Sequence, residues 1–192
     1  MATPIDAPSG AKSTTVGVTV DASESITLGL VDAGLFHVRD YDTGELAYWD
    51  DKETRPKMSP YVTGIVVATD GATTGPKGEK RLIGEGEQAT VFCEGGKYFA
   101  YNEAIKAFEA SGNSTETGDL FWFGCTGTEP ASNPRYNDRK VYEAKFGKPT
   151  TDYPGIVEMC DQARNALKAS KVDAPVAAPP ANGPAQAPSA PF

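Results

Sequence analysis

Short stretches in which apolar and polar residues alternate fill the first half of the chain and recur near its end. The side chains of a β strand point alternately to its two faces, so this pattern predicts strands that bury one face. A turn at residues 42–45 is expected to join two of these strands into a hairpin over residues 35–49. The predicted strands cover residues 15–20, 26–31, 35–41, 46–49, 61–69, 81–83, 88–93, 119–126 and 140–146.

Apolar residues at helical spacing predict two helices. The first lies between the predicted strands and is expected to end at Gly112. The second follows the last strand, where Thr151 or Asp152 can cap it and Pro154 would lie in its first turn. The apolar faces are Phe99, Ala100, Ala104, Ile105 and Phe108 in the first helix and Ile156, Met159, Cys160, Ala163 and Leu167 in the second.

The order of the elements predicts the fold class. Three strands, a helix and two further strands follow one another in an OB-fold, which is a small Greek-key barrel. The sequence therefore predicts a mainly β protein: an OB-like barrel with one internal helix, a C-terminal helix and a disordered tail. The expected organisation is a disordered lead over residues 1–14, an OB-like domain over 15–150, a helix over 151–171 and a tail over 172–192.

The tail is rich in proline and alanine, carries no charged side chain after Asp173 and ends in Pro191 and Phe192. Proline lacks a backbone donor and small side chains cannot build a core, so we expect this segment to be disordered. Its one large apolar group is Phe192, the last residue. Pro191 and Phe192 are therefore the expected contact of the tail with a protein partner.

Composition narrows the function classes. The net charge of -8 argues against a protein that coats DNA by charge alone, although an acidic total can still contain a basic groove. The three cysteines lack metal-ligand spacing, and with no signal peptide or membrane-spanning apolar run they indicate reduced thiols in the cytoplasm. No catalytic set accompanies the single histidine, His37, so we expect no enzyme activity, metal or cofactor. The sequence leaves homo-oligomerisation open.

Aromatic and cationic residues gather at two places. Single-strand binding requires cations along the phosphates and flat side chains on which bases stack. In the alternative interpretation, Tyr48, Trp49 and Trp122 belong to the core and the charged side chains form a solvated rim. Without the resemblance described below, the residues alone favour this alternative, because buried aromatic side chains are common. The candidate binding residues are Arg39, Tyr41, Tyr48, Trp49, Arg55, Lys57, Trp122, Arg135, Tyr136, Arg139, Lys140 and Tyr142.

Several segments in a fixed order resemble a family of small proteins from phages and mobile elements of actinobacteria. They are RDYDTGELAYWDD at 39–51, RPKM at 55–58, TD at 69–70, NEAIKAF at 102–108, NP at 133–134 and RKVYEA at 139–144. Members of this family are usually described as single-stranded-DNA-binding or uncharacterised proteins. The Pro-Phe end separately resembles the tail tip of bacterial single-stranded-DNA-binding proteins, which recruits replication and repair partners.

The resemblance implies a sequence-tolerant single-stranded-DNA-binding protein that acts in replication or recombination of a phage or mobile element. Its expected partners are single-stranded DNA and, through the tail tip, replication or repair proteins, in the cytoplasm of the host cell. A protein of another class also fits the net charge of -8: an acidic interaction protein that does not bind DNA, such as a host-enzyme inhibitor or a structural protein.

Overall fold

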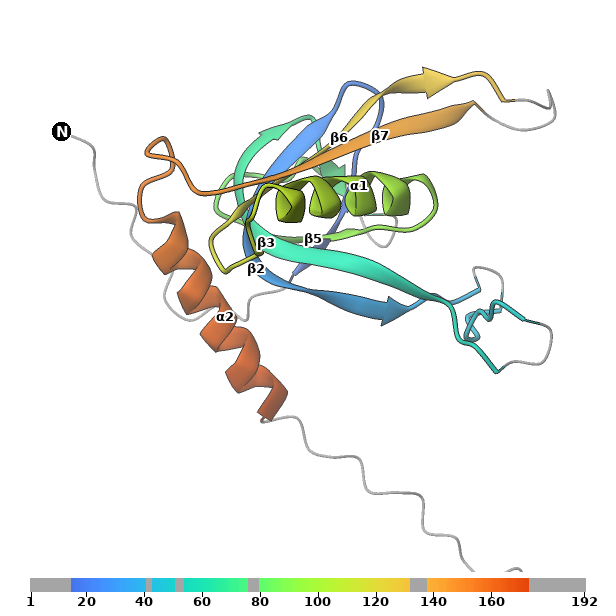
Figure 1. The fold of residues 1–192 in the computed structure, drawn as a ribbon, viewed down its shortest axis with the longest axis horizontal. Helices are drawn as coiled ribbons and strands as arrows, with labels where there is room; N and C mark the ends of the chain where they lie inside the picture. Colours follow the sequence, from blue (N-terminus) through green and yellow to red (C-terminus); the bar gives the residue numbers. More distant parts are fainter. Residues whose placement is uncertain (1–14, 41–42, 51–53, 76–79, 132–137, 173–192) are drawn as a thin grey trace, which may run out of the picture.

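The computed structural model describes residues 15–40, 43–50, 54–75, 80–131 and 138–172. The predicted lead, nearly all of the predicted tail and the candidates Tyr41, Arg135, Tyr136, Pro191 and Phe192 lie outside these residues. The described chain forms a seven-stranded sheet and two helices (Figure 1). The elements are β1 (Val16–Thr19), β2 (Ser25–His37), β3 (Met58–Asp70), β4 (Thr73–Thr74), β5 (Gln88–Phe92), α1 (Gly96–Ala110), β6 (Leu120–Glu129), β7 (Arg139–Gly147) and α2 (Ile156–Val172).

The strand order confirms the predicted fold class. The sheet runs β4-β1-β5-β3-β2-β6-β7, and the five strands from β5 to β7 pair antiparallel throughout. They form the order of an OB-fold: a three-stranded meander, a helix, and a fourth strand that returns to the first. The protein is therefore mainly β and barrel-like, with an internal helix between β5 and β6.

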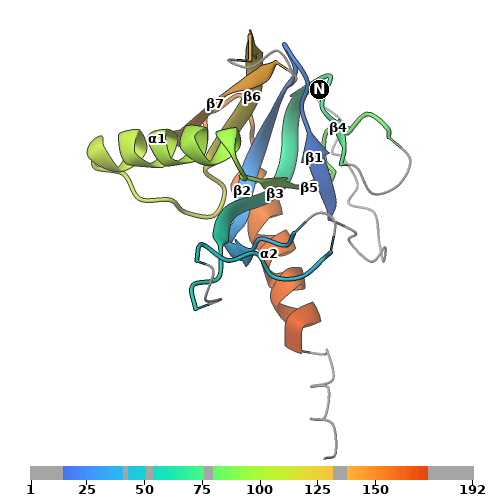
Figure 2. The ribbon, with the colours of Figure 1, turned by 90° about the vertical axis from the view of Figure 1, so that its right-hand side faces the viewer.

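The N-terminal strand β1 pairs in parallel with the outer edge of β5, with Val16 opposite Ala89 and Gly17 opposite Thr90. The short strand β4 pairs with the other edge of β1. Among the described strands no pairing joins this end of the sheet to β7, and α1 packs against β7 instead. Figure 2 shows α1 standing to one side of the strands.

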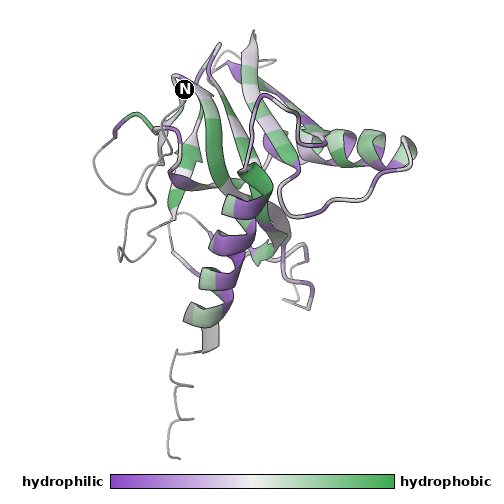
Figure 3. Ribbon diagram, turned by 90° about the vertical axis from the view of Figure 1, so that its left-hand side faces the viewer, coloured by the Kyte–Doolittle hydropathy of each residue, from purple (hydrophilic) through white to green (hydrophobic). Residues whose placement is uncertain are grey.

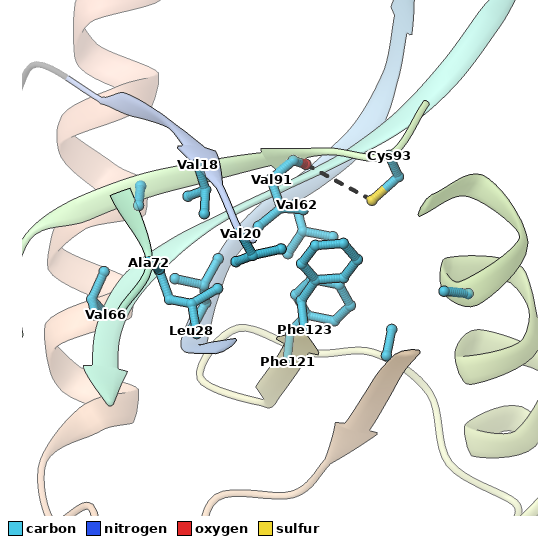
Figure 4. Packing of buried hydrophobic residues seen from close by; sticks show 14 of the residues in the cluster. Val18, Val20, Leu28, Val62, Val66, Ala72, Val91, Cys93, Phe121 and Phe123 are labelled. Atoms are coloured by element: carbon cyan, nitrogen blue, oxygen red, sulfur yellow. Dashed lines mark hydrogen bonds between the residues drawn. The ribbon is translucent and has the colours of Figure 1, made fainter. Parts of the chain in front are cut away.

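The main core lies inside the curved sheet. Phe121 and Phe123 of β6 are stacked with ring centroids 6.1 Å apart and are fully buried. Figure 4 shows valine side chains from β1, β3 and β5 around them, with the Cys93 thiol bonded to the carbonyl of Val91. In β1 the valines alternate with small residues, whereas β3 contains a continuous apolar run, and these are the two patterns from which the strands were predicted.

The second helix covers a separate patch on the outer face of β2 and β3. Ile156 and Cys160 of α2 are buried there against Val31 and Ile65. Hydrophilic and hydrophobic bands alternate along α2, as expected of a helix with one face on a sheet (Figure 3). Met159 was predicted to lie on the apolar stripe but is 44% exposed. It precedes the buried Cys160 by one position, about 100° around the helix, and so faces away from the sheet.

Several local predictions differ from the structure. The predicted strands at 26–31 and 35–41 belong largely to one strand, β2, in which a register shift between Leu30 and Asp32 exchanges the two faces. Within the predicted hairpin at 35–49 the structure has one isolated bridge, Arg39 with Leu46, and Tyr48 pairs with Pro56 outside it. The main partner of β2 in this region is β3, whose start at Met58 lies in the segment predicted to be a loop.

Candidate nucleic-acid interface

The connection between β2 and β3 begins with a closed ring of backbone hydrogen bonds. The N–H of Ala47 donates to the carbonyl of Val38 (2.9 Å), that of Lys57 to Ala47 (2.8 Å), and that of Val38 to Lys57 (2.9 Å). Three separate chain segments are therefore tied together at the end of the β2–β3 pair. This ring fixes the base of the loop that carries half of the candidate DNA-binding residues.

Two aspartates order the loop beyond the ring. Asp40 accepts the backbone N–H of Thr43 (2.9 Å), and Asp50 accepts that of Thr54 (2.9 Å). The side-chain hydroxyl of Thr54 also donates to Asp50, and this bond is the main reason that the pKa of Asp50 lies below its ordinary value. Such side-chain-to-backbone bonds are typical of tight turns, and here they hold Thr43 and Thr54 beside these aspartates without regular strands.

Trp49 lies at the surface of this loop. Its backbone N–H donates to the carbonyl of Arg55 (3.0 Å), which holds the residue in place, yet its side chain is 65% exposed. The Nζ of Lys57 lies 4.8 Å from the centroid of the indole ring, which is within the range of a cation–π interaction. The loop therefore presents an aromatic face with a cation beside it.

The start of α1 supplies the other side of a groove. Tyr98 and Phe99 are 40% and 68% exposed, with ring centroids 5.8 Å apart in an edge-to-face arrangement. Gly95, with a φ of 58°, makes the sharp turn from β5 into the helix. The groove has a volume of about 260 Å³ and is lined by Val38, Trp49, Lys57, Met58, Ser59, Glu94, Gly95, Tyr98 and Phe99.

The cations of the loop differ in their surroundings from those of β7. No carboxylate of the described residues forms an ion pair with Arg55 or Lys57. In contrast, Arg139 pairs with Glu129 (2.8 Å) and Lys140 pairs with Asp21. The hydrogen bond from Lys140 is also the main cause that lowers the pKa of Asp21. Arg55 and Lys57 therefore carry charges that no described carboxylate pairs with, whereas the charges of Arg139 and Lys140 are paired.

Tyr142, another predicted binding residue, belongs partly to the core. Its ring stacks on Phe123 with centroids 5.6 Å apart, and Lys97 lies 5.6 Å from the Tyr142 ring centroid. Burial raises the pKa of Tyr142 and lowers that of Lys97. The Tyr142 ring is therefore committed to packing, and a base could reach only its exposed edge.

Trp122 lies far from the groove. It pairs in register with Thr27 near the start of β2, whereas Val38 and the loop follow the other end of that strand. At about 3.3 Å per residue the separation is roughly 30–35 Å along the strand. Trp122 is half-buried, with Lys145 at 5.2 Å from its ring centroid.

The structure thus divides the predicted binding residues. Trp49 and Lys57 line the groove, and Arg39, Tyr48 and Arg55 belong to the loop beside it. The guanidinium of Arg39 donates to the carbonyl of Gly44 (2.9 Å) at the far end of this loop. The β6–β7 hairpin projects to the same side of the molecule, with the start of α1 between the two hairpins (Figure 1). Arg139 and Lys140 begin β7 at that hairpin.

Two groove residues were missed by the sequence patterns. The prediction that Phe99 faces the core is wrong, since its side chain is 68% exposed. Ala100, Ala104 and Phe108 form the buried stripe of α1, and Phe99 precedes Ala100 by one position, about 100° around the helix. The signal that could have found the groove is the pair Tyr98–Phe99, because two adjacent aromatics cannot both face one core.

Comparison with known proteins gave no relative. No family model matches the chain, and searches of curated proteins and of solved structures found no significant match. Within the described residues, no helix has the length and apolar character needed to cross a membrane. The same part of the chain holds no group of three or more histidine, cysteine, aspartate or glutamate side chains placed to bind a metal ion.

Proposed function

We propose that the protein is a non-catalytic single-stranded-DNA-binding protein that acts in replication or recombination of a phage or mobile element. The observation that carries this proposal is the groove in which Trp49, Tyr98 and Phe99 expose their rings beside Lys57. Aromatic platforms combined with cations are the requirement for sequence-tolerant single-strand binding. The setting would be the cytoplasm of the host cell.

The position of the groove in the fold supports the same function. In OB-folds the loop between the first two barrel strands and the loop between the last two contact oligonucleotides. The corresponding segments here are the β2–β3 connection, which contains Trp49 and Arg55, and the β6–β7 connection. The first carries cations that no described carboxylate neutralises, so a phosphate backbone can approach it despite the net charge of -8.

The test is fluorescence anisotropy with labelled oligo(dT), as a single strand and as a duplex with oligo(dA). We expect tighter binding of the single strand, because stacking on the aromatic groups requires unpaired bases. Trp49→Ala and Phe99→Ala should each weaken binding by about 1–3 kcal/mol, the range for one base–aromatic stack. The matched control is Leu82→Ala, which removes an apolar side chain of 68% exposure at the opposite end of the sheet.

Equal affinity for single strand and duplex would contradict the proposal. So would binding that Trp49→Ala and Phe99→Ala leave at the level of the Leu82→Ala control. Since Trp49 and Phe99 are largely exposed, these variants should unfold at the same temperature as the parent protein, and a thermal melt verifies this.

A second candidate function is supported by the apolar character of the groove. Exposed aromatic residues are also enriched in protein–protein interfaces, and Glu94 lies in the same lining. An acidic protein that binds another protein through Trp49 and Phe99 would show no oligonucleotide binding even at low salt. The titration with oligo(dT) therefore separates the two functions directly.

The tail completes the proposal. Pro191 and Phe192 supply the one large apolar group of the tail, which suits a partner pocket with an apolar floor. We propose that this tip recruits a replication or repair protein. Removing Pro191 and Phe192 should abolish capture of that partner and leave affinity for oligo(dT) unchanged, since the groove lies in the folded body. Retained capture would contradict recruitment through the tip.

A further inference from the structure

The lining of the groove contains one carboxylate among aromatic and apolar groups. Glu94 lies two residues after the end of β5 at Phe92 and immediately precedes the turn at Gly95, so it lies at the junction of the sheet and α1. It is exposed and has no ion pair with a cation of the described residues. A free carboxylate is an unfavourable neighbour for a phosphate, because like charges repel at short range.

The opposite side of the groove carries the positive charge. Lys57 lies beside Trp49, and Arg55 precedes it on the same loop. A bound strand therefore has one favourable orientation: its phosphates run along Lys57 and Arg55, and the edge of a base points toward Glu94. The base ring then lies between these two sides, among Trp49, Tyr98 and Phe99.

An ionised carboxylate only accepts hydrogen bonds, and its two oxygens can accept two parallel donors. Guanine presents two adjacent donors on its Watson–Crick edge, the N1–H and the 2-amino group. Cytosine and adenine present one amino donor beside an acceptor, and thymine presents one N–H between two carbonyls. Guanine is thus the base whose edge matches Glu94 without placing an acceptor against the carboxylate.

We propose that Glu94 is a specificity-determining residue that selects guanine in this groove. The inference rests on the proposed single-stranded-DNA-binding function and adds one base-selective position to an otherwise sequence-tolerant site. The selectivity comes from the charge pattern of the groove: cations on the loop side hold the backbone, and the carboxylate at the start of α1 reads the base.

The experiment compares three labelled single strands of about eight nucleotides, within the site size of one OB domain. One is oligo(dT), the second has a central dG, and the third has a central deoxyinosine, which keeps N1–H but lacks the 2-amino group. A bidentate contact to a base discriminates by about 1–3 kcal/mol, so the dG strand should bind about 5- to 150-fold more tightly than oligo(dT). The deoxyinosine strand should lose most of this gain.

Glu94→Gln should abolish the preference for dG over deoxyinosine while keeping oligo(dT) binding, because the single amide oxygen accepts the N1–H that both bases share and leaves no acceptor for the 2-amino group. The matched control is Glu109→Gln, which removes the same charge from the exposed surface at the other end of α1. This control should retain the full dG preference. The general gain from losing the charge of Glu94 should raise the affinity for all three strands alike, so the ratio of affinities between strands is the readout.

The outcomes separate the role of Glu94 from the proposed single-stranded-DNA-binding function. Binding of all three strands with equal affinity, or a preference for dG over deoxyinosine that survives Glu94→Gln, overturns the role of Glu94 and leaves single-strand binding intact. Absence of binding to every strand overturns the proposed function and the inference with it. A preference for dG over deoxyinosine that disappears in Glu94→Gln and persists in Glu109→Gln supports both.

Discussion

Trp49 and Trp122 are the two tryptophans of the chain, and they occupy different surroundings. Trp49 is exposed in the groove beside Lys57, whereas Trp122 is half-buried on the sheet near Ser25 and Gly124. This difference makes each indole a reporter of its own region. At the scale of single residues, intrinsic fluorescence can therefore locate the bound strand.

Variants with one tryptophan each should respond differently to DNA. In Trp122→Phe the remaining Trp49 should be quenched when oligo(dT) is added, because a base stacks on its ring. In Trp49→Phe the remaining Trp122 should keep its intensity. Quenching in the second variant but not the first would show that the strand crosses the sheet face instead of the loop.

The buried thiols predict a loss of stability at alkaline pH. Burial raises the pKa of Cys93 from 9.0 to about 12 and that of Cys160 from 9.0 to about 11. Above pH 9 the unfolded chain releases these protons while the folded protein keeps them, so the free energy of unfolding falls as pH rises toward the folded values. Urea unfolding below and above pH 9 measures this fall.

The contribution of one thiol can be isolated with Cys93→Ala. This variant should be less stable at neutral pH, since Cys93 is fully buried, but its stability should decline less steeply with pH. Burial also raises the pKa values of Tyr101 and Tyr142, so part of the alkaline decline should remain. An unchanged slope in Cys93→Ala would contradict the assignment.

Among the elements, α2 depends on the absence of side chains beneath it. A Cβ added at Gly29 of β2 would lie 2.5 Å from Cγ1 of Ile156 and 2.9 Å from Sγ of Cys160. Gly29 thus provides the space into which the start of α2 packs. The contact is short because the helix lies directly on the strand backbone.

Gly29→Ala should therefore destabilise the protein by about 1–3 kcal/mol, the usual cost of overpacking a core. Gly127→Ala on β6 is the matched control, because a Cβ there meets no atom within 4 Å. Both variants should bind oligo(dT) as the parent does, since neither position lines the groove. A Gly29→Ala protein as stable as Gly127→Ala would show that α2 shifts freely on the sheet.

The elements also show which features a sequence reveals. Apolar runs predicted β3, β6 and β7 well, because both the run and the strand follow from burial of the same side chains. The continuity of β2 was missed for two reasons. The bulge near Val31 breaks the alternation of apolar and polar residues. Gly34 adds no side chain to the pattern, and its place is covered by the ring of Tyr61, which leaves little room for a Cβ. Both features depend on tertiary packing, so they cannot be predicted from the local periodicity of the sequence.

The candidate site was predicted only in part for a similar reason. Trp49 and Lys57 are found from local sequence because aromatics and cations cluster in one segment. Tyr98 and Phe99 meet them only through the fold, which brings the start of α1 beside the β2–β3 loop. Trp122, in contrast, is an aromatic residue of the kind that binds bases, but it lies on β6 opposite the other end of β2.

For the whole molecule, a charge of -8 with a local cationic loop predicts a moderate salt dependence. Each phosphate neutralised in a single strand contributes a slope of about -0.7 to the plot of log affinity against log salt. Arg55→Gln and Lys57→Gln should each make this slope shallower, while Arg139→Gln, whose charge is paired with Glu129, should change it less. A steeper effect of Arg139→Gln would place the backbone along β7.

The pairing of β1 with β5 has a consequence for the order of events during synthesis. The ribosome completes β1 early, but its partner strand follows only after β2 and β3. Until β5 is made, β1 cannot form this pairing. Once β5 has been made, its edge stays unpaired until β1 binds to it. Exposed strand edges pair readily with other chains, so we expect β1 to reduce aggregation by covering the edge of β5. A protein shortened to begin after Val20 should accumulate in inclusion bodies even though its groove residues are complete.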